Sequence, residues 1–489
     1  MITLPLPHPH RPLFAKDSTM RLPPNFRDFL PYPIESLKQV AQLIGQPQWI
    51  SAMKEAAEKM GMKEPFGPGS FQQVVQQAGK WVEAITEPWI HPVVGDEQKP
   101  GINATGEIFS SRWTNSPCSL DIAGALVRYS SDYTESAKAI DRLRSIVTTR
   151  MGAADVVVFA NTSSALLALS SSYRQTKPTR WILPRVDCVR IPRLGIPGPS
   201  NLRTPLDHAG VVVAEIGSNQ DCSLEDFQTA IESESDMVLV CSPNSILDET
   251  ERKNHYAMAR EASLAKQATL VEVLFNGSLH PVPSYSDLTR SIEAAWSGGN
   301  HILLIPGEFY LGGPECCLAL TQNKSEPWTR MQRMVNDTGL EASAFIQSWI
   351  CRELASIDNE SGWLDSSLGQ CLTTSLENLN HRAERAAIQL RGTPWIDRAS
   401  VTQQDCRLGS GIWSQQRLKS AILELFPKEQ SPTALANWLL NGERPIWCNV
   451  HSDHVDVVFR TMTPDHDRYL IQRLCDSPSS PDVRTESES

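Results

Sequence analysis

Seven short runs of β-branched and other apolar residues in the middle of the chain constrain its fold more than any other feature. Runs of this length and composition, bounded by polar segments, are typical of buried strands. They are Val156–Phe159, Trp181–Leu183, Val211–Val213, Met237–Val240, Leu270–Leu274, Ile302–Ile305 and Leu318–Leu320. The sequence therefore predicts a sheet of seven strands, most of them inside the protein.

Segments with helical spacing separate many of these runs, and this alternation indicates how the strands are connected. Helices are expected at 162–173, 223–233 and 250–267. Strands that alternate with helices form parallel sheets with helices on both faces. We therefore predict an α/β domain over 96–350 with a largely parallel seven-stranded sheet, and a long helix at 328–357 that leaves it.

The regions on either side of this domain have a different character. Residues 1–95 form a proline-rich arm and a helical region, 351–475 a smaller α+β domain, and 476–489 a polar tail that we expect to be disordered. The expected elements of these regions are helices at 34–62, 70–86, 431–440 and 464–475, strand-like residues around Trp413 and an antiparallel hairpin over 446–459.

Charge and composition exclude several classes of protein. The 489 residues include 45 lysines and arginines against 56 aspartates and glutamates, a net charge of −11, which argues against indiscriminate binding to nucleic acids. No apolar run approaches the roughly 20 residues that span a bilayer, and the N-terminal segment lacks the apolar stretch of a signal peptide. The 11 cysteines include no CxxC pair, as expected of reduced thiols. We expect a cytoplasmic protein that binds neither DNA nor membranes.

Three loops that follow predicted strands carry residues suited to ligand binding, because parallel sheets bind ligands beyond the carboxyl ends of their strands. Residues 161–164 (NTSS) open a helix, where backbone amides and hydroxyls can hold a phosphate. Alternatively, one of these residues is only the helix cap. The loops 306–314 (PGEFYLGGP) and 275–278 (FNGS) contain glycines that indicate either a specific backbone path or an ordinary turn.

The segment HSDH at 451–454, followed by Asp456, groups residue types that bind metals. It lies between the alternating apolar runs 446–450 and 455–459, a pattern that is typical of a hairpin. We interpret the segment as a hairpin tip in preference to a metal site, and we predict no metal ligands in this chain.

Five segments, taken in their order along the chain, form a pattern that no single motif provides. They read GINATGEIF (101–109), GAADVVVFANTSSALLAL (152–169), GSNQDCSLEDFQTAI (217–231), LGGPECCLAL (311–320) and LANWLLNGERPIWCNVHSDHVDVVFRTMTPDHDRYLIQRL (435–474). Together they resemble the selenocysteine synthase family, L-seryl-tRNA(Sec) selenium transferase. The resemblance implies an aspartate-aminotransferase-like large domain that uses pyridoxal phosphate (PLP), a C-terminal α+β domain and a helical N-terminal region that contacts tRNA.

Two positions that the family's chemistry requires hold apolar residues in this chain. The family's PLP-binding lysine falls on Phe309, and a phenyl ring cannot form a Schiff base. No lysine lies between Lys266 and Lys324, so a small shift of register does not supply one. The aspartate that keeps the PLP pyridinium nitrogen protonated falls on Val273, and neighbouring Glu272 is expected to face the opposite side of the strand.

Other polar positions of the family also differ. Residues 241–244 read CSPN where the family has His-Thr-Ser-Asn, and a pair of substrate-binding arginines falls one residue out of register, near Arg330 and Arg333. One residue on a helix is a rotation of about 100°, so these arginines are expected to face elsewhere. The segments that resemble the family are thus mainly structural, and the differences fall on its chemistry.

We interpret the chain as a pseudoenzyme of this family, acting as a scaffold or regulatory subunit, with no catalytic residue and no covalently bound PLP. The family implies a homo-oligomer, a dimer or larger, and it implies tRNA binding, which the net charge does not support. The vestigial cofactor pocket would comprise Asn161, Thr162, Ser163, Ser164, Gly312 and Gly313.

Two enzymatic interpretations remain as alternatives. The chain could be an active PLP-dependent L-seryl-tRNA(Sec) selenium transferase, or a related lyase, whose catalytic residues have moved. It could also be an enzyme with new chemistry that uses Glu308 as an acid or base, or a thiolate. The candidate thiols are Cys188, Cys241, Cys316 and Cys317, each of which is also compatible with an ordinary buried cysteine.

Overall fold

A seven-stranded mixed sheet forms the centre of the predicted large domain. The computed structural model describes residues 101–110, 113, 115–116, 136–173, 180–188, 201–242, 249–275, 277–278, 290–296, 298–357, 360–410, 413 and 416–476. The strands are β3 (Asp155–Phe159), β4 (Arg180–Pro184), β5 (Val212–Ile216), β6 (Met237–Ser242), β7 (Thr269–Leu274), β10 (His301–Pro306) and β12 (Cys317–Thr321). All seven predicted strands are therefore confirmed.

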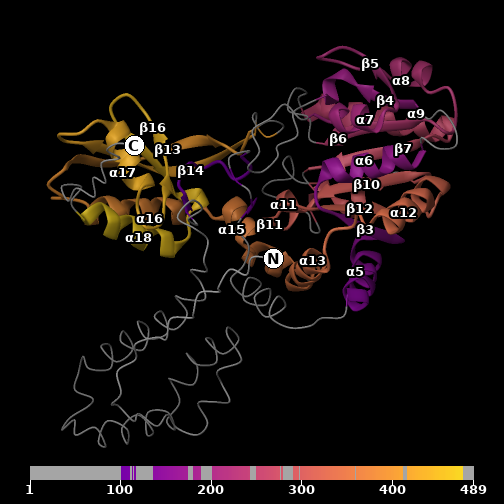
Figure 1. Ribbon diagram of the computed structural model, residues 1–489. Coiled ribbons are helices and arrows are strands. Elements are labelled where there is room, and N and C mark those ends of the chain that lie inside the picture. The colour runs from indigo at the N-terminus through magenta and orange to yellow at the C-terminus, as the bar shows by residue number, and fades with distance from the viewer. Residues whose placement is uncertain are drawn as a thin grey trace, which may run out of the picture. The chain divides into compact units, whose positions relative to one another are not determined.

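The strand order, β3-β12-β10-β7-β6-β4-β5, brings strands from distant parts of the chain together (Figure 1). Strand β12 runs antiparallel to β3 and to β10, and the remaining neighbours pair in parallel. The predicted largely parallel sheet is thus confirmed. Six strands consequently have their carboxyl ends at one edge of the sheet, together with the start of β12.

Helices cover both faces of this sheet, and the alternation of strand side chains decides which residues meet which helix. The helices are α6 (Thr162–Tyr173), α7 (Arg203–Ala209), α8 (Leu224–Ala230) and α9 (Glu249–Lys266). Ile182, Val238 and Leu270 belong to one buried cluster with residues of α8 and α9. Their strand neighbours Trp181 and Val271 belong to a larger cluster with residues of α6 and α7.

The segment predicted as one long helix over 328–357 is two helices, so this prediction is wrong. Helix α12 (Glu326–Thr338) ends at Gly339, whose φ of +66° ends the helix with a left-handed residue. Helix α13 (Ala344–Ser356) begins after Ser343, whose side chain accepts a hydrogen bond from the Ile346 amide. A glycine cap followed by a serine cap therefore divides the apolar pattern.

A second, antiparallel sheet lies in the C-terminal part of the chain, with strand order β13-β14-β17-β16. Its core includes residues of the surrounding helices, and it also includes Ile102 and Ala104 from the start of the described chain. The strands are β13 (Ile396–Arg407), β14 (Arg417–Pro427), β16 (Asn449–Val450) and β17 (Val455–Val458), and the helices are α16 (Leu376–Gln389), α17 (Pro432–Leu440) and α18 (Pro464–Cys475).

The predicted helices at 431–440 and 464–475 are confirmed, as is an antiparallel hairpin, formed by β16 and β17. The first arm of that hairpin is shorter than predicted, because β15 (Ile446–Trp447) pairs in parallel with β1 (Ile102–Asn103) instead. Trp413 is not in a strand: its amide bonds to the Ser410 carbonyl at 3.2 Å, which places it in a turn before β14.

The remaining elements are short connections or flank the sheets. They are α5 (Ser136–Met151), α10 (Ile292–Ala295), α11 (Gly307–Tyr310), α14 (Glu360–Asp365), α15 (Ser367–Thr373), β2 (Asn115–Ser116), β8 (Gly277–Ser278), β9 (Arg290–Ser291), β11 (Gly313–Pro314) and the 3₁₀ turns η2 (Arg185–Asp187) and η5 (Phe459–Thr461). The predictions for 1–95 and for the tail beyond Asp476 lie outside the described residues. Within the part of the chain that is described, no helix is long and apolar enough to cross a membrane.

Candidate functional site

Asn161 caps helix α6 at the carboxyl end of β3. Its Oδ1 accepts hydrogen bonds from the amide and the hydroxyl of Ser164, at 2.8 and 2.9 Å. The helix cap that the sequence offered as an alternative for this loop is therefore present. The cap uses the amide and the hydroxyl of Ser164, two groups that could otherwise bind a phosphate. A phosphate at this loop would therefore depend mainly on the amides of Thr162 and Ser163.

Thr162 is directed into the protein. Its side chain lies beside the thiol of Cys317 on β12, and both residues are buried. The start of α6 therefore packs against the strand that follows the glycine loop.

Gly312 and Gly313 shape the chain between α11 and β12. Their φ angles are +78° and +75°, values that favour glycine. A Cβ on Gly313 would overlap the indole ring of Trp349, which is buried on α13. Packing and backbone conformation thus account for the Gly313 that the sequence assigned to the pocket.

Helix α11 carries the loop's only acidic residue, Glu308, into the interior. Glu308 is 2% exposed, and burial raises the pKa of its carboxyl to about 8. One of its oxygens accepts a hydrogen bond from the Cys316 amide at 3.3 Å. A carboxyl in this environment holds its proton at neutral pH and is enclosed by the protein. Phe309, on which the sequence resemblance places the family's lysine, is the next residue of the same helix.

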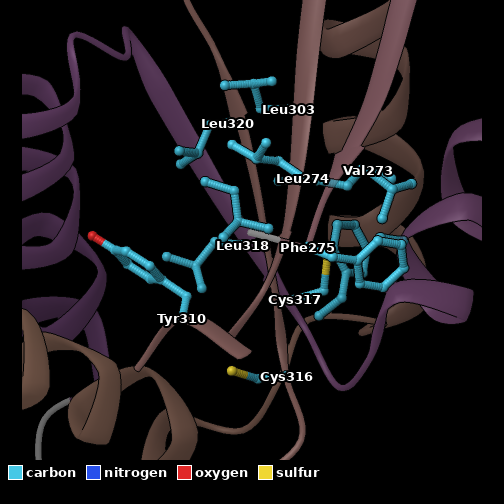
Figure 2. Close-up of a cluster of buried hydrophobic side chains, with 14 of the residues drawn as sticks. Val273, Leu274, Phe275, Leu303, Tyr310, Cys316, Cys317, Leu318 and Leu320 are labelled. Carbon is cyan, nitrogen blue, oxygen red and sulfur yellow. The ribbon is translucent and has the colours of Figure 1, made fainter. Parts of the chain in front are cut away.

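Val273 lies at the carboxyl end of β7, inside the apolar cluster that fills this edge of the sheet. It is fully buried, and its strand partners are Leu304 on β10 and Cys241 on β6. Figure 2 shows Val273, Leu274 and Phe275 grouped with cysteine and leucine side chains of β12. Aliphatic, aromatic and thiol groups therefore surround Val273, the residue on which the sequence resemblance places the family's aspartate.

Glu272 faces the other side of β7, as the sequence predicted. Its Oε1 accepts a hydrogen bond from Arg290 at 2.5 Å, and His301 lies 3.6 Å from its Oε2. Arg290 in turn stacks on the ring of Tyr256 from α9, with 3.9 Å between the guanidinium and the ring centroid. Glu272 is thus the anion of a buried ion pair on the face that α9 covers, and it does not replace the missing aspartate.

The lysines whose side chains the structure describes are all exposed: Lys266, Lys324, Lys419 and Lys428. Lys266 ends α9, which confirms the surface position predicted for it. Lys324 follows β12 and lies 3.2 Å from Asp155, the first residue of β3. The amino end of β3 is at the edge of the sheet opposite the candidate pocket, so Lys324 is on the wrong side to replace a pocket lysine.

The candidate thiols have the properties of structural cysteines. Cys241, Cys316 and Cys317 are buried, and burial raises the pKa of each thiol well above its usual range. Cys188 is half-buried, and burial raises its pKa to about 11. A thiol with a raised pKa is protonated at neutral pH and is a poor nucleophile.

Arg330 and Arg333 lie on α12. Arg330 is paired with Glu326 of the same helix through a hydrogen bond of 3.0 Å from its Nε, and Arg333 is exposed. Gln332, between them, bonds instead to Asp155 at the amino end of β3. The helix therefore contacts the edge of the sheet opposite the candidate pocket, in agreement with the prediction that these arginines face elsewhere.

A buried polar cluster at the carboxyl ends of β4 and β6 was missed by the sequence analysis. Asp187 accepts a hydrogen bond from His255 at 2.8 Å and lies 3.5 Å from the thiol of Cys241. Burial lowers the pKa of His255, but the Asp187 carboxylate outweighs it, so that the pKa is raised. A polar residue soon after a strand was a signal for Asp187, whereas nothing in the sequence indicated that His255 on α9 reaches it.

The residues at this site do not fit PLP held as a Schiff base. The cofactor needs an amine to form the imine and a carboxylate beside its ring nitrogen. The sequence resemblance places these two groups on Phe309 and on the buried Val273, and the adjacent Glu272 is paired elsewhere. What is retained is the capped start of α6 and the glycine-shaped loop.

The order and direction of the strands, together with the flanking helices, define the protein as having the fold of PLP-dependent transferases. A solved D-glucosaminate-6-phosphate ammonia-lyase has a similar fold, with a TM-score of 0.53 at 13% identity, covering 80% of this chain and 96% of that one.

The model of the L-seryl-tRNA selenium transferase family matches residues 121–463, and this chain belongs to that family. The L-seryl-tRNA(Sec) selenium transferase of Alkaliphilus oremlandii is 21% identical over 394 residues, which are 76% of this chain and 80% of the relative. That of Carboxydothermus hydrogenoformans is 21% identical over 427 residues, 83% and 86% of the two chains.

Proposed function

We propose that this protein is a member of the L-seryl-tRNA selenium transferase family that has lost PLP Schiff-base chemistry and acts as a scaffold or regulatory subunit. The single observation that carries the proposal is the burial of Val273 in an apolar cluster, where the cofactor chemistry of the family needs a carboxylate. Without a carboxylate beside its ring nitrogen, PLP loses most of its capacity to accept electrons from a substrate.

The positions of the lysines support the same proposal from an independent direction. No lysine occurs in the sequence between Lys266 and Lys324, the stretch that contains β7, β10 and α11. Both of these flanking lysines are exposed, and Lys324 lies at the opposite edge of the sheet. An imine at this pocket would therefore need a lysine from outside the described residues.

The protein is expected to act in cells as a homo-oligomer in the cytoplasm, or as a partner of an active relative. Its net charge of −11 gives little support to binding of seryl-tRNA, which depends on neutralising phosphates. Native mass spectrometry of the purified protein tests the assembly. A dimer or larger species is the expected result, and a monomer at micromolar concentration would contradict this part of the proposal.

The deciding experiment is reduction of the protein with borohydride in the presence of PLP, followed by peptide mass mapping. The relative from Alkaliphilus oremlandii, treated in parallel, controls for the method. We expect low, scattered labelling on exposed lysines such as Lys266 and Lys324 and no stoichiometric adduct. A single pyridoxyl-lysine that a substrate analogue blocks would overturn the proposal and would favour an active PLP-dependent transferase or lyase with a relocated lysine.

Non-covalent docking of PLP is a separate question, since a phosphate at the start of α6 requires only amides and hydroxyls. Equilibrium dialysis with PLP measures it directly. We expect binding that inorganic phosphate displaces and that is weaker than the binding of PLP by the relative. Binding that is as tight as in the relative, with no lysine adduct, would show that the pocket is intact and would contradict the proposed loss of function.

A further inference from the structure

The hairpin between β16 and β17 brings together two histidines and an aspartate at its tip. The tip is closed by a hydrogen bond of 2.9 Å from the His451 amide to the His454 carbonyl, and Val450 pairs with Val455 just before it. The two imidazole rings stack, with centroids 4.5 Å apart and planes 8° from parallel. The predicted hairpin is therefore present, and its turn places both rings on the same side.

Asp456 supplies an acidic group beneath these rings. It is 4% exposed, and its Oδ2 lies 2.9 Å from Nε2 of His451. Its Oδ1 lies 3.3 Å from Nε2 of His454, but it has no hydrogen-bond partner within the described part of the chain. A buried carboxylate oxygen without a hydrogen bond is costly, because the group has lost its water without a replacement.

Asp453 determines which nitrogen of His454 is available. The carboxylate of Asp453 lies 2.7 Å from Nδ1 of His454 and accepts a hydrogen bond from this nitrogen. In a neutral imidazole, Nε2 then carries a lone pair, and this nitrogen lies 3.3 Å from Oδ1 of Asp456, which has no hydrogen-bond partner within the described residues. Two electron-rich atoms at 3.3 Å with no proton between them make a place for a cation. A carboxylate on the outer nitrogen is also the usual partner of a histidine that binds a metal.

The spacing of the three groups suits a tetrahedral ion. Their candidate ligand atoms all lie within 4.8 Å of one another. Neighbouring ligands of tetrahedral zinc, at bond lengths near 2.0–2.1 Å, are roughly 3.3 Å apart. The carboxylate of Asp456 lies near that distance from both histidines, with 2.9 Å from Oδ2 to Nε2 of His451 and 3.3 Å from Oδ1 to Nε2 of His454. The side chain of His451 is 47% exposed, which leaves the fourth position open to water.

The surrounding residues hold this group in place without competing for the ion. Glu424 pairs with Asp456 across β14 and β17, but its two oxygens already accept hydrogen bonds from Ser400 and Thr402, each at 3.0 Å. The ring of Phe426 stacks on His454 with 5.0 Å between centroids. The contact with Phe426 restricts the orientation of the His454 ring.

We propose, in contrast to the prediction from the sequence, that His451, His454 and Asp456 form a binding site for a divalent transition metal of the zinc class, with Asp453 as the residue that orients His454. The site is built entirely on the β16–β17 hairpin and is independent of the proposed loss of PLP chemistry. An ion at this position would connect the tip of the hairpin to the buried strand β17.

The test uses the untagged full-length protein. Zinc is titrated by calorimetry and retained metal is measured by mass spectrometry after dialysis, while cobalt(II) is the spectroscopic probe. We expect one equivalent per chain and the visible absorption of tetrahedral cobalt. His454→Ala and Asp456→Asn should abolish both, and Asp453→Ala should weaken binding by about 10- to 100-fold without changing the stoichiometry.

Two controls separate this site from incidental binding. His381→Ala removes an exposed histidine of α16, and a variant with alanine at His8 and His10 removes the pair in the N-terminal arm. Both should keep the equivalent of metal. Circular dichroism of the metal-free variants checks folding, and His454→Ala remains informative if Asp456→Asn does not fold. Unchanged binding in folded His454→Ala, or no binding by the wild type, would overturn the proposal.

Discussion

Replacing Val273 by aspartate restores the residue type that the family's cofactor chemistry uses and places a carboxylate in an apolar cluster. Val273 is fully buried on β7, with Leu304 and Cys241 as its strand partners. The nearest acidic neighbour in sequence, Glu272, lies on the opposite face and is already paired with Arg290. Arg290 is thus engaged by Glu272, and His255 is engaged by Asp187, the carboxylate beside Cys241.

The expected loss of stability has three contributions. Removing the buried valine costs about 1.5–3 kcal/mol, and an unsatisfied polar group at the same place costs about 1–3 kcal/mol. Ionisation adds about 1.4 kcal/mol for each pH unit above the ordinary range of aspartate, which reaches roughly 4 kcal/mol at neutral pH. The total is comparable to the whole stability of a typical domain, so Val273→Asp should be largely unfolded at neutral pH.

The assay is urea unfolding followed by circular dichroism, with two controls. Val273→Asn carries the same shape without the charge, and Val212→Asp places the charge at a site that is 58% exposed. In Val273→Asp, the folded state holds the proton of the newly introduced, buried carboxyl more tightly than the unfolded state does. Stability of Val273→Asp should therefore fall relative to Val273→Asn as pH rises, by roughly 2 kcal/mol between about pH 5.5 and 7. Val212→Asp should change stability by less than about 0.5 kcal/mol.

The reasoning would be refuted by a Val273→Asp protein as stable at neutral pH as Val273→Asn. That result would mean that water or a cation reaches the carboxylate and that the pocket is more open than the burial of Val273 indicates. Stabilisation of Val273→Asp by added PLP, absent from Val273→Asn, would lead to the same conclusion. Either outcome would revive the active-enzyme alternative.

Two further substitutions test the loop between α11 and β12. Gly313→Ala should lower the free energy of unfolding by about 2–4 kcal/mol, because its Cβ meets the ring of Trp349 at a φ of +75°. Gly339→Ala, at a φ of +66° with open space around it, should lower the free energy of unfolding by about 1–2 kcal/mol. Equal losses in thermal unfolding would contradict the packing argument. Burial raises the pKa of Glu308 to about 8. The wild type should therefore lose stability as pH rises from the ordinary glutamate range to about pH 8, by at most about 1.4 kcal/mol per pH unit. Glu308→Gln should remove this dependence in denaturant titrations across that range, and an unchanged slope would show that Glu308 is not the group responsible.

Much of the fold was predictable because its signals are local. Each strand of the large sheet coincides with an apolar run, and the family resemblance was visible in ordered segments such as 152–169 and 311–320. The error at 328–357 arose because apolar spacing continued across Gly339 and Ser343, which cap two separate helices. Glycine after a helix and serine before one are typical terminal residues, so the sequence carries a signal for both ends.

The candidate site was predictable only in part. The apolar residues Phe309 and Val273 could be identified from the sequence, because the resemblance indicates where the family has its lysine and aspartate. The partner of Glu272 was not readable, because Arg290 lies 18 residues further along the chain and reaches it only through the packing of the sheet. The role of the loop at Asn161 was also not predictable, since a helix cap and a phosphate site have the same composition and only the folded structure distinguishes them.

The sequence by itself determined the strands, the family and the absence of a lysine between Lys266 and Lys324, because each depends on residue identity and spacing. The tertiary structure decided what surrounds those residues. It showed the apolar packing around Val273, the buried pairing of Glu272 and the convergence of His451, His454 and Asp456. The physical reason is that burial, protonation and the direction of a lone pair depend on atoms from separate strands and helices, and only the folded chain brings these atoms together.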